Sequence, residues 1–165
     1  MLSVLFSQGK TIYSFDASAI LDAYARWYPM ECFPSLWSKL YELAQEDRLK
    51  VISFAFDELT NEDNALKKWC QDLKGLIHVG IEGESIQRIV RDLLAKHKKL
   101  LGEAKNRSGA DPWIIALAKE QSMTVVTGEK LSGNLDKPKI PDVCADYGIR
   151  CIDIMQLIKD EGWIF

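Results

Sequence analysis

This sequence predicts an α/β fold with a central, mostly parallel sheet covered by helices on both faces. Short β-rich runs alternate with amphipathic segments along the chain, and each run leads directly into a helical pattern. No segment of the sequence repeats another. A chain of 165 residues with 47% hydrophobic content suits one domain spanning residues 1–165.

In the first half of the chain, each strand is expected to run directly into a helix. Runs of β-branched and aromatic residues mark the strands, and apolar residues three and four positions apart mark the helices. The expected elements are a strand at 11–15, a helix after Asp16, an amphipathic helix after Pro34, a strand at 51–54 and a helix from Asp57 onward.

The second half continues the alternation with one weaker strand and a polar loop. Proline near a helix start and Asp before an apolar run support the boundaries. The expected elements are a strand at 76–79, a helix at 86–94 that turns basic at Lys96, a loop at 102–109, a helix opened by Asp111 and Pro112, strands at 123–127 and 150–152, and a last helix capped by Asp153.

Charge and cysteine content narrow the possible functions. A net charge of −3 and a pI near 5.5 argue against binding nucleic acid through a broadly basic face, so any RNA must be held locally. The four cysteines show no CxxC spacing and are expected to be buried reduced thiols. The N-terminus lacks a signal-peptide pattern and no apolar run is long enough for a membrane span, which predicts a cytoplasmic protein without membrane contact.

Acidic residues follow the predicted strands at positions where they should meet. The carboxyl ends of parallel strands share one edge of a sheet, and ligands bind there. Asp16 directly follows the first strand, and Glu129 follows the 123–127 strand after one glycine. Asp111 begins the helix that leads into that same strand, and topology alone leaves open which edge it occupies.

The chemistry of such a cluster indicates a metal-dependent phosphodiesterase. Carboxylates without histidine or thiolate favour Mg²⁺ or Mn²⁺ over zinc, and His78 and His97 fall outside these positions. A bound cation can turn water into a nucleophile and stabilise the charge that develops on phosphate. Crowded carboxylates repel one another, so the cluster makes sense mainly with a cation bound.

Four segments carry a resemblance to a known family. The segments SFDASAILD, FDEL, GADPWIIALA and VVTGEK resemble, in order and at comparable spacing, those of PIN-domain proteins, over roughly residues 11–160. The resemblance implies a three-layer α/β/α sandwich and metal-dependent endoribonuclease activity on RNA. Many such proteins are toxins of type II toxin–antitoxin pairs, as in the VapC proteins, so a cognate antitoxin is an expected partner.

The resemblance also implies roles for individual residues. The acids that would hold Mg²⁺ or Mn²⁺ and act in catalysis are Asp16, Glu58, Asp111 and Glu129. The family places the helix start at Asp111 in the acidic pocket, and Ser18 matches a small polar residue that supports the first acid. Thr127 is present as expected, but Glu129 stands where the family usually has Asp. A longer arm at this position alters the expected metal geometry. The 139–154 stretch and the helix near Trp37 resemble a divergent branch of the family.

Each candidate also has an ordinary structural explanation. Asp16 and Asp111 could be helix caps, Glu58 a solvated helix residue with Asp57 as the true ligand, and Glu129 an exposed loop acid with Asp136 as its competitor. For substrate binding, the candidates are Ser18, Thr127, Lys105 and Arg107. The lysine-rich stretch near Lys105 and Arg107 could contact phosphates or simply end a helix.

Three functional hypotheses follow. The first is the endoribonuclease, and the second is a catalytically degenerate PIN-like module that binds protein or RNA, suggested by Glu129. The third is a phosphoacceptor receiver-like domain using Asp16, Asp57 and Lys130. Most aromatic residues are expected in the core. The apolar segment YPMECFP, residues 28–34, is expected to form an interaction surface for an antitoxin or a homodimer.

Overall fold

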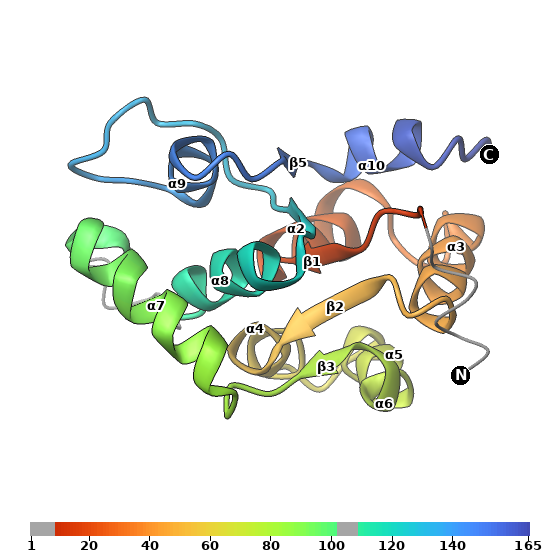
Figure 1. The fold of residues 1–165 in the computed structure, drawn as a ribbon. Helices are drawn as coiled ribbons and strands as arrows, with labels where there is room; N and C mark the ends of the chain where they lie inside the picture. The colour runs from red at the N-terminus through yellow and green to blue at the C-terminus, as the bar shows by residue number, and fades with distance from the viewer. Residues whose placement is uncertain (1–8, 102–108) are drawn as a thin grey trace.

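A five-stranded sheet forms the centre of the molecule, and all of its strands run parallel (Figure 1). The computed structural model describes residues 9–101 and 109–165. The strand order is β3-β2-β1-β4-β5, so the first strand lies in the middle. The strands are β1 (Tyr13–Phe15), β2 (Leu49–Ile52), β3 (His78–Val79), β4 (Thr124–Val126) and β5 (Cys151–Ile152).

Helices cover both faces of this sheet. The contacts between elements place α7 (Glu84–Lys96), α8 (Asp111–Gln121) and α9 (Ile140–Asp146) on one face, with α8 between the other two (Figure 1). The opposite face carries α2 (Ala17–Asp22), the π-helix η1 (Ala23–Trp27), α3 (Pro34–Gln45), α4 (Ser53–Leu59), α5 (Ala65–Asp72), α6 (Lys74–Ile77) and α10 (Ile154–Asp160). A 3-10 turn, η2 (Lys98–Leu101), follows α7. The predicted three-layer α/β/α sandwich is confirmed.

The central strands are buried on both faces, as their composition requires. Phe15, Val51 and Val126 are each 0% exposed. In a parallel sheet covered on both sides, alternate side chains enter two separate apolar layers, so the strands read as continuous hydrophobic runs. This explains why short segments such as VVT were recognisable as strands without any polar alternation.

Several element boundaries differ from the sequence prediction. Of the strand predicted at 76–79, only His78–Val79 is strand, because Leu76 and Ile77 belong to α6. β2 ends at Ile52, and Ser53 and Phe54, predicted as strand, already belong to α4. The apolar residues of VISF fit either element, but burial of Ala55, Phe56 and Leu59 at helical spacing favours an earlier helix start. The predicted helix at Asp57 therefore begins four residues sooner.

A π-helical turn interrupts the first helical segment. The backbone N–H of Tyr28 donates to the carbonyl of Ala23 at 2.7 Å, five residues back. The regular α2 ends at Asp22, and η1 carries the chain toward Pro29. π-Turns occur mostly as single widened turns and are frequent at functional sites. No periodicity in the sequence distinguishes this turn from an ordinary helix.

The amino edge of the sheet is closed by a buried arginine. Arg48 is 5% exposed, and its guanidinium donates to the Thr11 carbonyl at 2.7 Å and to both oxygens of Glu161, near the C-terminus. The Tyr13 hydroxyl also donates to Glu161, at 2.6 Å. Burial and this hydrogen bond raise the pKa of Tyr13. These paired groups fix the end of α10 against β1.

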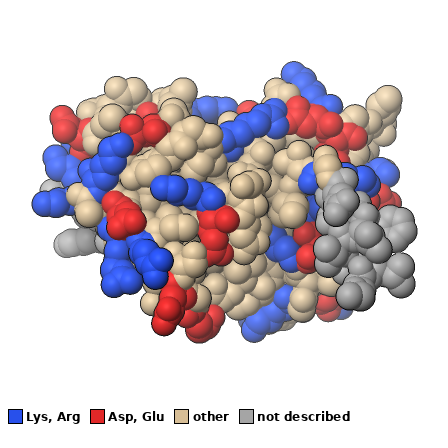
Figure 2. Space-filling view, viewed as in Figure 1, with Lys and Arg blue, Asp and Glu red and all other residues tan. Residues whose placement is uncertain are grey.

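The surface carries both signs of charge, interspersed over the face shown in Figure 2. Among the described residues, no helix is long and apolar enough to cross a bilayer. Of the cysteines, Cys70 and Cys144 are buried and Cys151 is half-buried, but Cys32 is exposed. The expectation of four buried thiols is therefore wrong at Cys32, which lies in the 28–34 segment.

Candidate functional site

The centre of the candidate site is Asp16, at the carboxyl end of the middle strand. Its backbone N–H donates to the Val126 carbonyl at 2.8 Å, which continues the β1–β4 ladder. Asp16 occupies the N-cap position of α2 with an extended backbone, yet its side chain makes no capping hydrogen bond. The carboxylate is 5% exposed. Helix capping therefore does not explain this aspartate.

Two hydroxyls hold one oxygen of the Asp16 carboxylate. Ser18 Oγ donates to Oδ2 at 2.5 Å, and Thr127 Oγ1 donates to the same oxygen at 2.7 Å. The two hydroxyl oxygens lie 3.4 Å apart. Ser18 comes from α2 and Thr127 from the end of β4, so the contact joins two neighbouring strand ends. Ser18 thus contacts Asp16, the acid that the resemblance expects it to support, whereas the contact of Thr127 with Asp16 was not predicted.

The turn after β4 is built around the same hydroxyls. The Gly128 N–H donates to Ser18 Oγ at 2.9 Å, and the Glu129 N–H donates to Thr127 Oγ1 at 3.1 Å. A β-carbon at Gly128 would lie 2.7 Å from Asp22 Oδ2 and 3.3 Å from Ser18 Oγ. A side chain at this position would have to displace the Asp22 carboxylate and press on Ser18, so glycine allows the turn to lie close to α2 without moving them.

The second oxygen of Asp16 is left for another partner. Within the described residues, Oδ1 accepts no hydrogen bond, whereas Oδ2 accepts two. No buried side-chain oxygen or nitrogen of the described residues lacks a partner, so Oδ1 keeps some contact with solvent. The arrangement fixes the carboxylate through one oxygen and leaves the other without a hydrogen-bond partner among the described residues.

Asp111 starts α8 at the carboxyl edge of the sheet, the edge at which Asp16 lies. The Ser14 hydroxyl in β1 donates to the Ile114 carbonyl at 3.0 Å. The fourth residue of α8 therefore lies level with the middle residue of β1. The other end of α8 lies at the amino edge, where Thr124 donates to the Ile12 carbonyl. Asp111 therefore lies about 4.5 Å along the helix axis beyond Ile114, toward the carboxyl edge.

Glu58 lies on α4, which leaves the carboxyl end of β2 directly. Its side chain is half-buried and lines a shallow hollow with Leu21, Phe54 and Asp57. The Phe54 ring lies 5.8 Å from the ring of Trp113, two residues after Asp111. The starts of α4 and α8 are thus neighbours. Asp57, the alternative ligand, is exposed on α4. It does not directly follow a strand, whereas the phosphoacceptor of a receiver-like domain would.

Glu129 uses its carboxylate at the start of another helix. Its Oε2 accepts a hydrogen bond from the Ile140 N–H at 2.9 Å, at the first residue of α9. Asp136, its competitor, is exposed in the following loop. The charges of Asp16 and Glu129 both oppose ionisation of Cys151, although the hydrogen bond from Cys144 lowers the pKa of this thiol overall.

The predicted residues are only partly gathered. The structure brings together Asp16, Ser18 and Thr127, and it places the starts of α4 and α8 on the carboxyl side of the sheet. Within residues 9–101 and 109–165, no three His, Cys, Asp or Glu side chains approach closely enough to form a metal site. Lys105 and Arg107 lie outside the described residues. Lys96, just before them, is paired with Asp146 at 2.8 Å.

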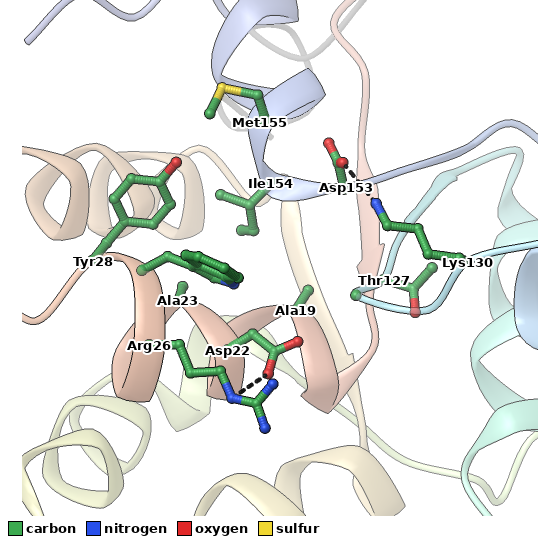
Figure 3. Close-up of a pocket in the computed structure, with 12 residues that line it drawn as sticks. Ala19, Asp22, Ala23, Arg26, Tyr28, Thr127, Lys130, Asp153, Ile154 and Met155 are labelled. Atoms are coloured by element: carbon green, nitrogen blue, oxygen red, sulfur yellow. Dashed lines mark hydrogen bonds and ion pairs between the residues drawn. The ribbon is translucent and has the colours of Figure 1, made fainter.

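A cavity of about 420 Å³ adjoins the site and was not predicted. Its walls come from α2, η1, the turn after β4 and the start of α10, and they include Asp22, Arg26, Lys130 and Asp153 (Figure 3). Thr127 and Gly128 also line it. Asp22 lies four residues after Ser18 on α2, so helical spacing from Ser18 could have identified it. Asp153 caps α10, as expected, by accepting from the Gln156 N–H at 2.8 Å.

Comparison with known proteins places almost the whole chain in one family. No curated protein matches the chain. A family model described as "Domain of unknown function (DUF4411)" matches residues 13–165, which include β1, the turn after β4 and every described site residue discussed above. The protein therefore belongs to the DUF4411 family.

Proposed function

We propose that the protein is a metal-dependent endoribonuclease with Asp16 as its central acid. The observation that carries the proposal is the environment of Asp16, which is buried at the end of the middle strand. Two hydroxyls fix its Oδ2, and within the described residues its Oδ1 has no hydrogen-bond partner. A carboxylate that the fold holds in place, but does not neutralise with a cation, is suited to bind a metal ion.

The donor set fits a hard divalent cation. Asp16, Glu58, Asp111 and Glu129 offer only oxygen, which Mg²⁺ and Mn²⁺ prefer. Asp16 supplies Oδ1, and Glu129 keeps one oxygen beside the one that accepts from Ile140. Repulsion between carboxylates favours their separation without a cation. When bound, the cation would lower the pKa of a water molecule and offset charge on the phosphodiester.

The remaining residues have positioning roles in this proposal. Ser18 and Thr127 orient Asp16, and Gly128 lets their two segments approach. The start of α8 lies at the carboxyl edge of the sheet, as Asp16 does, and α8 begins with Asp111. Carboxylates that bind metal are commonly fixed by such outer hydrogen bonds, whose loss costs about 10- to 100-fold in affinity or activity. In this proposal Ser18 and Thr127 therefore position Asp16, and their expected role in binding RNA is secondary.

A role as the toxin of a type II toxin–antitoxin pair in the cytoplasm completes the proposal. The 28–34 segment supports a protein partner because it presents apolar groups at the surface. Phe33 is 41% exposed, and its ring packs edge-on against Tyr28 with centroids 5.2 Å apart. A cognate antitoxin or a second copy of the chain would cover this segment.

The decisive experiment replaces Asp16 with asparagine. Asp16→Asn keeps the size of the side chain but removes the charge that holds the cation, so we expect metal-stimulated cleavage of single-stranded RNA to fall by a factor of at least about 100. The melting temperature should stay the same or rise, because one buried charge disappears. Asp136→Asn, at an exposed loop acid, is the control. Full cleavage by the Asp16 variant would refute the proposal.

A second candidate is a catalytically degenerate module that binds RNA or protein. Two observations favour it. Glu129 accepts a hydrogen bond from the start of α9, and among the described residues no three His, Cys, Asp or Glu side chains are grouped closely enough to hold a metal ion. Titration calorimetry with Mn²⁺ and Mg²⁺ separates the two candidates. The nuclease requires a saturable cation site that Asp16→Asn removes, whereas the binding module requires none.

A further inference from the structure

The cavity beside Thr127 combines features that a metal site does not need. We define the Asp22 cavity as the space of about 420 Å³ lined by α2, η1, the turn after β4 and the start of α10. Its volume lies at the lower end of the range for small-molecule sites, which suits one nucleotide. Figure 3 shows Asp22 and Arg26 on one side and Lys130 with Asp153 on another.

The charged groups of the cavity are held loosely. Asp22 pairs with Arg26 at 3.7 Å, and Lys130 pairs with Asp153 at 3.4 Å. The basic side chains are 71% and 79% exposed, and the acidic ones 34% and 42%. Exposed ion pairs at such distances contribute little stability. A ligand can therefore separate them at small cost, with carboxylates inward and cations at the rim.

An exposed aromatic ring borders the same space. Trp27 lines the cavity and is 65% exposed, the largest exposure of any tryptophan in the described residues. The π-turn η1 places it there together with Arg26. Aromatic faces stack on bases of single-stranded RNA, and stacking tolerates any base. Small residues, Ala19 and Ala23, form the wall from α2 and η1 and leave room for a ring.

The cavity is separated from the proposed catalytic acid by one side chain. Thr127 lines the cavity and also donates to Asp16 Oδ2 at 2.7 Å. A nucleotide seated here would be separated from the Asp16 carboxylate by the Thr127 side chain. Arg26 and Lys130 at the rim can contact the flanking phosphates, because cationic side chains fix the RNA backbone without reading its sequence.

We propose that the Asp22 cavity binds one guanine nucleotide of the RNA next to the bond that is cut, an inference that rests on the proposed nuclease function. Carboxylates only accept hydrogen bonds, so they select a base edge rich in N–H donors. Guanine presents adjacent N1–H and N2–H donors, which match the two oxygens of Asp22. Uracil presents a single such donor between two carbonyls, and its carbonyls would face the carboxylate.

Binding of mononucleotides tests the site without relying on cleavage. The probes are 5′-GMP, AMP, CMP and UMP, measured by NMR titration of the metal-free protein. We expect GMP to bind about tenfold more tightly than UMP. Asp22→Asn should weaken GMP about tenfold and UMP little, whereas Trp27→Ala should weaken all four about tenfold. Equal affinities for GMP and UMP, unchanged in Asp22→Asn, would overturn the proposal.

The chain offers matched controls for both variants. Asp72 pairs with Lys68 four residues earlier in sequence on α5, at the same 3.7 Å as the Asp22–Arg26 pair. Tyr41 is 42% exposed on α3 and does not line the cavity. Asp72→Asn and Tyr41→Ala should leave GMP affinity unchanged. A loss in these variants equal to that in the cavity variants would overturn the assignment of binding to this cavity.

Cleavage of an RNA with one guanosine in a run of uridines separates this proposal from the nuclease itself. We expect the wild type to cut beside the guanosine and Asp22→Asn to lose that preference. GMP binding that depends on Asp22, without cleavage of any RNA, would support the cavity and refute the nuclease. Cleavage lost in Asp16→Asn, but with no base preference in any protein, would support the nuclease and refute the cavity.

Discussion

Asp16 and Asp142 are two equally buried aspartates with opposite surroundings. Each is 5% exposed. Asp142, in the first turn of α9, accepts from the backbone of Ser132 and Gly133 at Oδ1, and from Lys139 and the Ser132 hydroxyl at Oδ2. Within residues 9–101 and 109–165, Asp16 accepts only from two hydroxyls, both at a single oxygen.

The difference separates a buried acid whose two oxygens the fold satisfies from one that is held at a single oxygen. Backbone N–H groups cannot move away from Asp142, and together they satisfy both of its oxygens. Burial alone would raise the pKa of Asp142, but hydrogen bonds from Ser132, Lys139 and Gly133 lower it. Asp16 has no such set of donors, so part of its hydrogen-bonding capacity is left for a metal ion or water. Burial by itself does not separate the two roles, whereas the number and type of donors do.

The largest effect is expected from Asp142→Asn on stability. In asparagine an NH₂ group replaces one of the two oxygens, and it would face groups that are themselves hydrogen-bond donors. We therefore expect the free energy of unfolding to fall by about 3 kcal/mol. Urea denaturation measures it, with Asp136→Asn in the loop before α9 as the control. Cleavage per folded molecule should persist. Unchanged stability with lost cleavage would reverse the roles assigned to the two aspartates.

Acid unfolding gives a second measure of the same carboxylate. The pKa of Asp142 is lower in the folded than in the unfolded protein, where the ordinary value is 3.8. Its contribution is therefore fully present above that value and is lost as the pH falls through the folded pKa. Stability measured from pH 5 downward should fall less steeply in Asp142→Asn than in the wild type. Parallel curves would contradict the assignment.

The sequence predicted the sheet and the position of Asp16 because both depend on simple periodicity. Apolar runs located every strand, and the residue after a parallel strand must lie at the carboxyl edge. The resemblance to PIN-domain proteins pointed to Ser18 as a support for Asp16, which agrees with the hydrogen bond between them. Asp111 lies at this edge because a helix that returns antiparallel to its strand begins where the strands end.

Features that depend on side-chain direction or irregular backbone could not be predicted. The spacing of Glu129 after β4 does not show that its carboxylate turns toward Ile140, eleven residues later. The Asp22 cavity depends on the π-turn at 23–27, which has the composition of an ordinary helix. The start of α4 at Ser53 was missed because VISF suits a strand and a helix equally well.

Removing one hydroxyl from Asp16 should have an intermediate effect. Thr127→Val keeps the shape of the side chain but removes the donor to Oδ2, so Asp16 should lose its fixed orientation. We expect cleavage to fall about tenfold and stability by about 1 kcal/mol. The control is Thr124→Val, at a buried threonine of the same strand that lies away from Asp16. If both variants cleave equally well, the hydroxyls do not position the acid.

The smallest effect is expected from Glu129→Gln. Glutamine keeps an oxygen that can accept from the Ile140 N–H, so the start of α9 and the free energy of unfolding should not change. Only the charge is lost, and because one oxygen is already engaged, we expect Mn²⁺ affinity to fall by less than about tenfold. Calorimetry with Mn²⁺ measures this loss, and Glu129→Ala, which also removes the contact with Ile140, separates charge from capping. If Glu129→Gln abolished cation binding as fully as Asp16→Asn, Glu129 would rank with Asp16 as a main ligand.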